Sequence, residues 1–415
     1  MASFLSIARS ARRQARNIIN LLRGRPVTYP PLGSVTLDKD DVLLARQWLK
    51  DRSKWNDPEE VRRYEQEFAE WNGSKYAFAF MGGRVALSAC IHALGLKSGD
   101  EVIIPGYTCV VVPNSFAYAG VKVVYSDIEL ETYGLDESLL KEKITSNTKA
   151  IMLHHLYGLV CRDFDKILQL TQDHGLWVIE DCAHATGAEY KGRKVGNFGH
   201  VAFYSSEQSK VFTTIQGGMA VTNDENLAAG LQEYADQAPT PDTERIKKQL
   251  YNVILNYYQF KHPKRWILGD LATMMYGKYR LISTTKQEEC GIQPDIYGMK
   301  MPAPIASIGR NQLQKLDAYN KRRRDGAEKW KKWSLKNSYS TPVIIKDSKP
   351  VFLRYPVLVE PEKKRDLYWA KKELKVSPGV WFVSNVHPAD WEVWDCPNAD
   401  MAVNECINFP TIAND

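Results

Sequence analysis

Lys210 and Asp181 are the two residues whose types and surroundings point most clearly to chemistry. Lys210 follows a short apolar run at 201–205, and Asp181 follows a stronger apolar run at 176–179. If both runs are neighbouring strands of an α/β sheet, their carboxyl ends project into the crevice where such folds bind ligands. A lysine that can form a Schiff base and an acid that keeps a pyridine nitrogen protonated are groups that pyridoxal phosphate requires. The pair therefore indicates a pyridoxal phosphate site.

The phosphate of that cofactor needs a binding site of its own. Residues 76–80 read as an apolar strand, and Gly82, Gly83 and Arg84 lead from it into a helical pattern that runs to Leu94. Free N–H groups and the helix dipole favour an anion at a helix N-terminus. Glycine permits close backbone approach, and the guanidinium can add a charged contact. We therefore expect the phosphate at Gly83 and Arg84.

Four longer stretches follow one another along the chain at 94–105, 149–158, 178–199 and 210–218. In this order they resemble the DegT/DnrJ/EryC1/StrS family of sugar aminotransferases. The resemblance covers most of the chain. It implies an α/β fold of the fold-type-I class of pyridoxal phosphate enzymes. Such a fold has a large, mainly parallel-sheet domain wrapped by helices and a smaller α+β C-terminal domain.

The resemblance also implies roles for individual residues. Lys210 is the Schiff-base lysine and the catalytic proton carrier, and Asp181 pairs with the pyridine nitrogen. The remaining cofactor contacts implied are His184 beside the phenolic oxygen, Ser205 on the phosphate, and Gly83 with Arg84 at the start of the phosphate-binding helix.

At three positions the chain departs from the family pattern. Arg84 stands where the family usually has threonine, so a guanidinium replaces a hydroxyl. Cys109 stands where an aromatic ring usually stacks on the cofactor, and nearby Tyr107 is the substitute that we expect. Gly298 stands at the position of an asparagine that usually reaches the partner subunit's phosphate site. We expect these contacts to be absent or made differently.

The implied activity is amino transfer from an amino acid, with glutamate as the expected donor, to a nucleotide-activated keto-sugar. This places the protein in polysaccharide or glycoconjugate biosynthesis, and the resemblance implies a homodimer. Aminotransfer to a cyclitol or another secondary-metabolite ketone is an open alternative, as is a non-enzymatic scaffold or sensor with this fold. Dehydratases of this fold are implied to carry histidine in place of the lysine, so Lys210 argues against that reaction.

Composition fits a cytoplasmic enzyme. The chain has 415 residues, 44% of them apolar, and a modest net charge of +6 that gives no reason to expect nucleic acid. Its seven cysteines show no metal-ligand spacing, which indicates reduced thiols. His154 and His155 are adjacent and would point to opposite faces of a strand. We therefore expect no metal.

Four segments can be distinguished. They are a basic amphipathic helix over 1–25, a pyridoxal phosphate-binding large domain over 26–235, an aromatic-rich helical insertion over 236–290, and a small C-terminal domain over 291–415. The insertion reads as two helical stretches, 250–260 and 266–276, and one long polar helix is expected after Pro304. Asp57 and Pro58 predict the capped start of another helix. The first segment carries arginines at 9, 12, 13, 16 and 23 opposite its apolar face. It could dock on the enzyme, lie on an anionic membrane together with the insertion, or act as a transit peptide. No apolar run reaches the ~20 residues that span a bilayer.

Overall fold

A computed structural model describes residues 35–261, 266–281, 283–294 and 297–412, together with single positions at 15, 19 and 22. The predicted basic helix of residues 1–25 lies outside the described residues except at those three positions. Its interpretation as a docked helix, a membrane contact or a transit peptide therefore stays a prediction.

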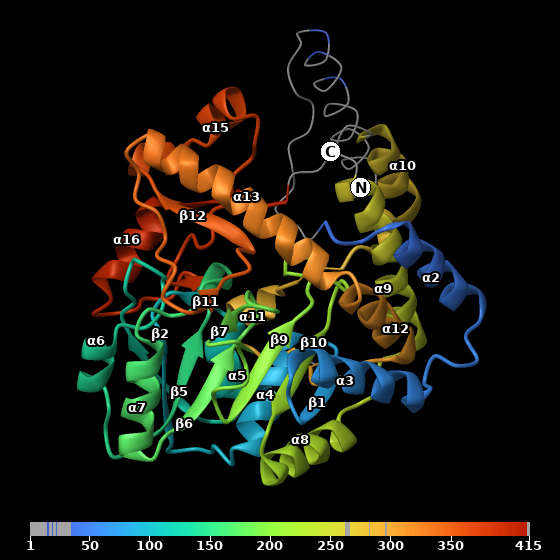
Figure 1. Cartoon of the computed structure of the whole chain (residues 1–415). Helices are drawn as coiled ribbons and strands as arrows, with labels where there is room; N and C mark the ends of the chain where they lie inside the picture. The colour runs from blue at the N-terminus through green and yellow to red at the C-terminus, as the bar shows by residue number, and fades with distance from the viewer. Residues whose placement is uncertain are drawn as a thin grey trace.

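A seven-stranded sheet forms the centre of the molecule (Figure 1). Its strands, in spatial order, are β1 (Tyr76–Phe80), β10 (Gly218–Thr222), β9 (Val201–Ser205), β6 (Trp177–Asp181), β5 (Thr148–His154), β2 (Glu101–Pro105) and β4 (Lys122–Ser126). Only β10 runs against the others, since it pairs antiparallel with both β1 and β9. The predicted mainly parallel sheet is confirmed.

Helices cover both faces of this sheet, because alternate strand residues point to opposite sides. Val102 and Met152 face a core shared with α4 (Gly83–Ala93), α5 (Val111–Tyr118) and α8 (Glu225–Gln237). Ile103 and Ile151 face a second core. The helices of that core are α2 (Lys39–Lys50), α3 (Pro58–Asn72), α6 (Glu137–Glu142), α7 (Phe164–His174), α9 (Thr243–Asn256) and α12 (Ala303–Leu313).

The insertion forms two helices, as predicted. The first is α9, continued by the π-helical turn η2 (Tyr257–Lys261), and the second is α10 (Trp266–Tyr276). The 3-10 turn η4 (Gly277–Tyr279) and the short helix α11 (Lys286–Glu289) follow. Asn252 holds η4 against α9, because its amide donates to the Tyr279 carbonyl at 2.6 Å and accepts from the Leu281 N–H at 3.3 Å. Across the described ranges, no helix has the length and apolar character needed to cross a membrane.

The single long helix that the sequence predicts after Pro304 is wrong, because the structure breaks it between α12 and α13 (Leu316–Lys336). Lys315 occupies the break, and its Nζ lies 2.6 Å from Asp41 and 3.1 Å from Asp40 of α2. The break allows α12 to pack beside the large sheet while α13 runs on toward β12 and α15 (Figure 1). The division into domains stays a proposal, and this packing favours a small domain that begins with α13.

The C-terminal elements from α13 onward, which we call the small domain, are built around β12 (Arg354–Leu358), which pairs antiparallel with β14 (Cys406–Pro410). Phe409 of β14 stacks on Trp330 of α13 with ring centroids 4.1 Å apart. The helices here are α14 (Pro361–Arg365), α15 (Tyr368–Glu373) and α16 (Pro397–Glu405). The remaining short elements are β3 (Thr108–Cys109), η1 (Leu156–Gly158), β7 (Glu189–Tyr190), β8 (Arg193–Lys194), β11 (Ser348–Lys349) and β13 (Val386–His387).

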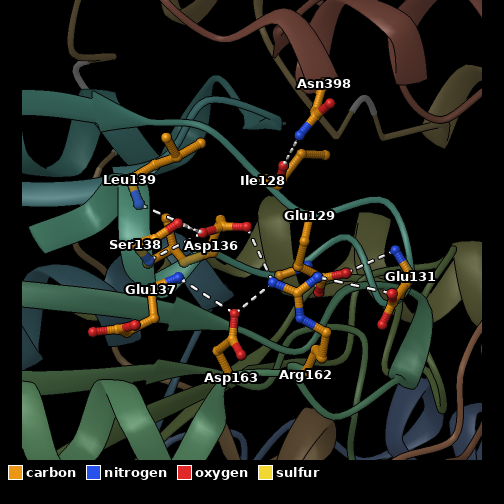
Figure 2. A network of polar contacts seen from close by, with 12 residues as sticks. Ile128, Glu129, Glu131, Asp136, Glu137, Ser138, Leu139, Arg162, Asp163 and Asn398 are labelled. Carbon is orange, nitrogen blue, oxygen red and sulfur yellow. Dashed lines mark hydrogen bonds and ion pairs between the residues drawn. The ribbon is translucent and has the colours of Figure 1, made fainter.

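A network of carboxylates around Arg162 fixes the loops at one end of the sheet (Figure 2). The guanidinium lies 2.6 Å from Asp163 and 3.0 Å from Asp136, with Glu131 at 3.9 Å. Asp136 caps α6, so the network joins the starts of α6 and α7. Close by, Asp127 accepts the N–H groups of Asn398 and Ala399, both at 2.9 Å. A carboxylate directly after β4 thus holds the N-terminus of α16.

Candidate active site

The structure brings Lys210 and Asp181 together as predicted. They follow or end two adjacent parallel strands, β9 and β6, in which Asp181 is paired in register with Phe203. Both side chains line one cavity of about 890 Å³. The two chemically suggestive residues therefore share one pocket at the carboxyl ends of the strands.

Lys210 contacts His184 directly, with Nζ and Nε2 2.9 Å apart. The Nδ1 atom of His184 accepts the Tyr157 N–H at 3.3 Å, which leaves the proton of a neutral imidazole on Nε2. Burial, and then the charges of Lys210 and Arg354, hold the pKa of His184 well below its usual value. Burial also lowers the pKa of Lys210. In its neutral form Lys210 can accept the Nε2–H hydrogen bond, and that form is the nucleophilic one.

The carboxyl group of Asp181 has the position and the pKa to pair with a cation. Burial raises its pKa to about 6, against the opposing effects of a 2.9 Å hydrogen bond from the Ala183 N–H and of the Lys210 charge. A protonated heterocycle placed beside this carboxylate would favour its charged form. The position and the electrostatics both suit the partner of a pyridine nitrogen.

The start of α4 forms a close-fitting cradle with the strand end at Ser205. A Cβ atom added to Gly83 would lie 2.8 Å from Cβ of Ser205 and 3.1 Å from its Oγ, so only glycine fits. The Ser205 hydroxyl lines the cavity beside the first turn of α4, where backbone N–H groups lack helical partners. A phosphate fits this combination of helix N-terminus, glycine and hydroxyl. The residues present therefore suit pyridoxal phosphate.

Arg84 makes contacts that the sequence does not predict. Its guanidinium pairs with Glu288 of α11 and donates to the Ser283 carbonyl oxygen. Arg84 also lines the cavity, so a contact with the cofactor's phosphate remains a proposal. The observed bonds connect the first turn of α4 to the insertion.

The expectation that Tyr107 replaces the missing stacking ring is wrong. Tyr107 is fully buried outside the cavity, where its hydroxyl bonds the Trp381 carbonyl and the Phe382 N–H. A Cβ atom on Gly106 would lie 2.5 Å from Sγ of Cys396, so the chain packs closely here against the start of α16. Tyr107 follows directly and lies in a core shared with the C-terminal elements. Cys109 does line the cavity.

Sequence reasoning missed two cavity residues from the small domain, Trp381 and Arg354. The Trp381 ring stacks on His184, with centroids 4.7 Å apart and planes at 19°, and Nζ of Lys210 lies 5.1 Å from its centroid. The guanidinium of Arg354 lies 3.4 Å above the same ring. Neither residue stands in a recognisable motif, and both are more than 140 positions from Lys210. Only the tertiary fold reveals them.

His155, Glu180 and Cys182 have potential metal-binding atoms within 4.8 Å of one another. The Glu180 carboxylate is already engaged, because it contacts Nε2 of His155 at 3.2 Å and accepts the backbone N–H groups of Gly196, Phe198 and Gly199. These bonds account for a buried carboxylate without a metal ion, so we assign no metal to the cluster.

Comparison with known proteins identifies the family. The sequence profile of the DegT/DnrJ/EryC1/StrS aminotransferase family matches residues 36–261 and 269–414. GDP-perosamine synthase of Escherichia coli O157:H7 is 31% identical over 330 residues, which cover 80% of this chain and 76% of that protein. The L-glutamine:2-deoxy-scyllo-inosose aminotransferase of Streptomyces kanamyceticus is 35% identical over 227 residues, 52% of this chain and 53% of that one.

Solved structures agree. The crystal structure of an aminotransferase from Psychrobacter cryohalolentis superposes with a TM-score of 0.70 and 26% identity, covering 93% of this chain and 95% of that one. The pocket that joins a lysine, a carboxylate and a phosphate cradle is the site that such an enzyme requires. The chain belongs to the DegT/DnrJ/EryC1/StrS family and is a pyridoxal phosphate-dependent aminotransferase.

Proposed function

We propose that this enzyme moves an amino group from glutamate to a nucleotide-activated keto-sugar in polysaccharide or glycoconjugate biosynthesis. The observation that carries the proposal is the shared cavity of Lys210, Asp181 and the Gly83–Ser205 cradle. The similarity to a GDP-perosamine synthase over most of the chain supports a nucleotide-linked sugar as the acceptor.

Each residue has a defined task in this proposal. Bound pyridoxal phosphate supplies an electron sink next to the amino-bearing carbon. Lys210 attaches the cofactor and, once released, carries a proton on Nζ to and from that carbon. Asp181 keeps the pyridine nitrogen protonated, and His184 orients Nζ through the 2.9 Å contact. Gly83 and Ser205 hold the phosphate, with Arg84 as a further proposed contact.

A cyclitol acceptor is the second candidate, because one relative is named for amino transfer from L-glutamine to 2-deoxy-scyllo-inosose. The non-enzymatic scaffold or sensor, which the departures at Cys109 and Gly298 left open, is set aside because the chain belongs to an aminotransferase family. We also propose a cytoplasmic homodimer with peripheral membrane contact. The exposed Leu271, Met274 and Met275 of α10 support such a contact. Sedimentation with and without liposomes tests both assembly and membrane binding.

The catalytic proposal is tested in two steps. First, the cofactor-loaded protein is mixed with glutamate or glutamine, and the visible absorbance of the cofactor is followed. We expect glutamate to change the spectrum without an acceptor, and an unchanged spectrum would contradict glutamate as the donor. Second, products from a panel of nucleotide keto-sugars and cyclitol ketones are identified by mass spectrometry. Amination of the cyclitols alone would contradict the proposed acceptor.

A further inference from the structure

We propose that the insertion carries an anion subsite for the diphosphate of the acceptor. The subsite consists of Arg245 and Lys248 of α9, Lys278 of η4, and Arg280 directly after it. This inference rests on the proposed function, because it names the substrate group that these cations recognise. It assigns the insertion, which no motif explains, a place in substrate binding.

All four side chains line the cavity that holds Lys210. Within the described parts of the chain, none of them forms an ion pair with a carboxylate. Lys247 differs, because it does not line the cavity and it pairs with Glu244 at 3.6 Å. The cations on the cavity side of α9 thus lack the acidic partner that their neighbour has.

The fold holds these cations on a common wall. Arg245 and Lys248 are three residues apart and share one face of α9. The Asn252 amide donates to the Lys248 carbonyl at 2.7 Å and to the Tyr279 carbonyl at 2.6 Å. One side chain therefore joins the helical turn of Lys248 to the turn that presents Lys278 and Arg280.

Like charges in this wall repel each other until an anion arrives. Burial lowers the pKa of Arg245, the Asp242 charge raises it, and the smaller effect of the Arg84 charge lowers it. Arg245 donates from Nη2 to Gln216 at 3.0 Å, but its Nε is buried without a hydrogen-bond partner. A bound anion would compensate the charges and accept from such donors, and guanidinium groups match phosphate geometry well.

A second phosphate group is needed because the cofactor's phosphate is assigned to Gly83 and Ser205. Among the described residues, the cavity wall contains seven Lys or Arg side chains and only three Asp or Glu. That excess exceeds what one phosphate neutralises. The cavity's 890 Å³ lies near the upper end of the ~300–1,000 Å³ typical of ligand pockets, which leaves room for a second ligand. A diphosphate joined to a sugar near Lys210 satisfies both the charge and the space.

The test is calorimetric titration of the cofactor-loaded enzyme with UDP, GDP and inorganic pyrophosphate. For Lys248→Gln and Arg280→Gln we expect Kd to rise about tenfold each, the size of one charge-assisted hydrogen bond. The double variant should show a larger rise in Kd than either single variant. Lys247→Gln is the matched control on the same helix and should bind like the native enzyme. Thermal melting without ligand checks that every variant is folded.

Several outcomes would overturn the subsite. One is a Kd that is the same for the native enzyme and the cavity variants. Another is a loss of affinity in the Lys247→Gln control as large as that in the cavity variants. A third is binding of uridine or guanosine as tight as that of UDP or GDP. A fall in affinity with rising salt is expected for a diphosphate held by cations. The glutamate-dependent spectral change of the native enzyme separates the two proposals. If it occurs while nucleotides bind all variants equally, the subsite fails and the aminotransferase proposal stands.

Discussion

The cation of Arg162 and the cations of the insertion lie in different electrostatic surroundings. Arg162 lies among three carboxylates, from Glu131, Asp136 and Asp163, at the sheet end near α6 and α7. The cations of the insertion face the cavity without acidic partners among the described residues. The carboxylates of the fold neutralise the charge of Arg162, whereas the charges of the second arrangement are neutralised only when an anionic ligand binds.

The difference separates a structural role from a binding role. Removing a cation that acidic groups already surround should lower stability, because it leaves those groups uncompensated. Removing a cation that lies among other cations, without an acidic partner, should cost little stability. It should weaken ligand binding instead. The contrast can be tested residue by residue.

The largest expected effect is at Lys210, the cavity cation that performs chemistry. Lys210→Ala should lower turnover with glutamate and a keto-sugar by about 10⁴-fold or more, because attachment and proton transfer both depend on Nζ. Borohydride treatment followed by peptide mass spectrometry should no longer tag this segment. Lys191→Ala, at an exposed lysine paired with Asp165 at 2.7 Å, is the control and should retain both properties. Full turnover by the Lys210 variant would remove the lysine from the mechanism.

Asp181 gives the next largest effect, and it depends on pH. Its pKa is about 6 in the folded apoenzyme and close to 3.8 when unfolded, so the folded state binds more protons between these values. The free energy of unfolding should therefore fall by about 2–3 kcal/mol as pH rises from 4 to 6. Asp181→Asn should abolish this part of the decline. Urea unfolding of both apoenzymes across pH 4–7 measures this decline. If the free energies of unfolding of the two proteins changed with pH in parallel, the Asp181 carboxyl group would have no raised pKa.

Arg162→Ala should lower the free energy of unfolding by about 1–2 kcal/mol at pH 7. Burial raises the pKa of Asp163, but the bonds from Arg162 and Lys166 outweigh burial and hold it below its usual value. This contribution is present above the unfolded pKa and is lost as pH falls through the folded one. The difference in the free energy of unfolding between the native enzyme and the variant should therefore become smaller at acidic pH. Lys166→Ala removes a more exposed partner of the same carboxylate and should cost less.

The smallest effect on stability is expected at Lys248, on the cavity wall. Lys248→Gln should change the free energy of unfolding by less than about 0.5 kcal/mol, because no acidic partner is lost. Urea unfolding alongside Arg162→Ala makes the comparison direct. A loss as large as that of the arginine variant would mean that Lys248 is a structural residue after all.

Much of the site could be predicted because its residues lie at the ends of regular elements. Apolar strands with polar residues at their carboxyl ends place Lys210 and Asp181 together, and paired glycines before a helix mark the phosphate cradle. These signals are local, so the sequence carries them. The same reasoning predicts the capped start of α3, where Asp57 accepts the Glu59 N–H.

The other half of the pocket depends on contacts between distant segments. Trp381 and Arg354 reach the cavity only because the small domain packs over the carboxyl ends of the strands. The close approach of Gly106 and Cys396 sends Tyr107 away from the cofactor position, although Cys109 two residues later faces it. Neither event has a periodic pattern or motif. The break at Lys315 likewise depends on acidic residues in α2, far away in the sequence.

The ion pair between Arg84 and Glu288 has a consequence for engineering. One helical turn is the proposed seat of the cofactor's phosphate and, through its arginine, the anchor of the helical segment over 236–290. Replacing the insertion with a shorter loop from another family member would discard Glu288 and leave a bare guanidinium beside that seat. A chimaera designed to change acceptor preference would thus also alter how firmly the protein retains vitamin B6, unless residue 84 is exchanged together with the loop.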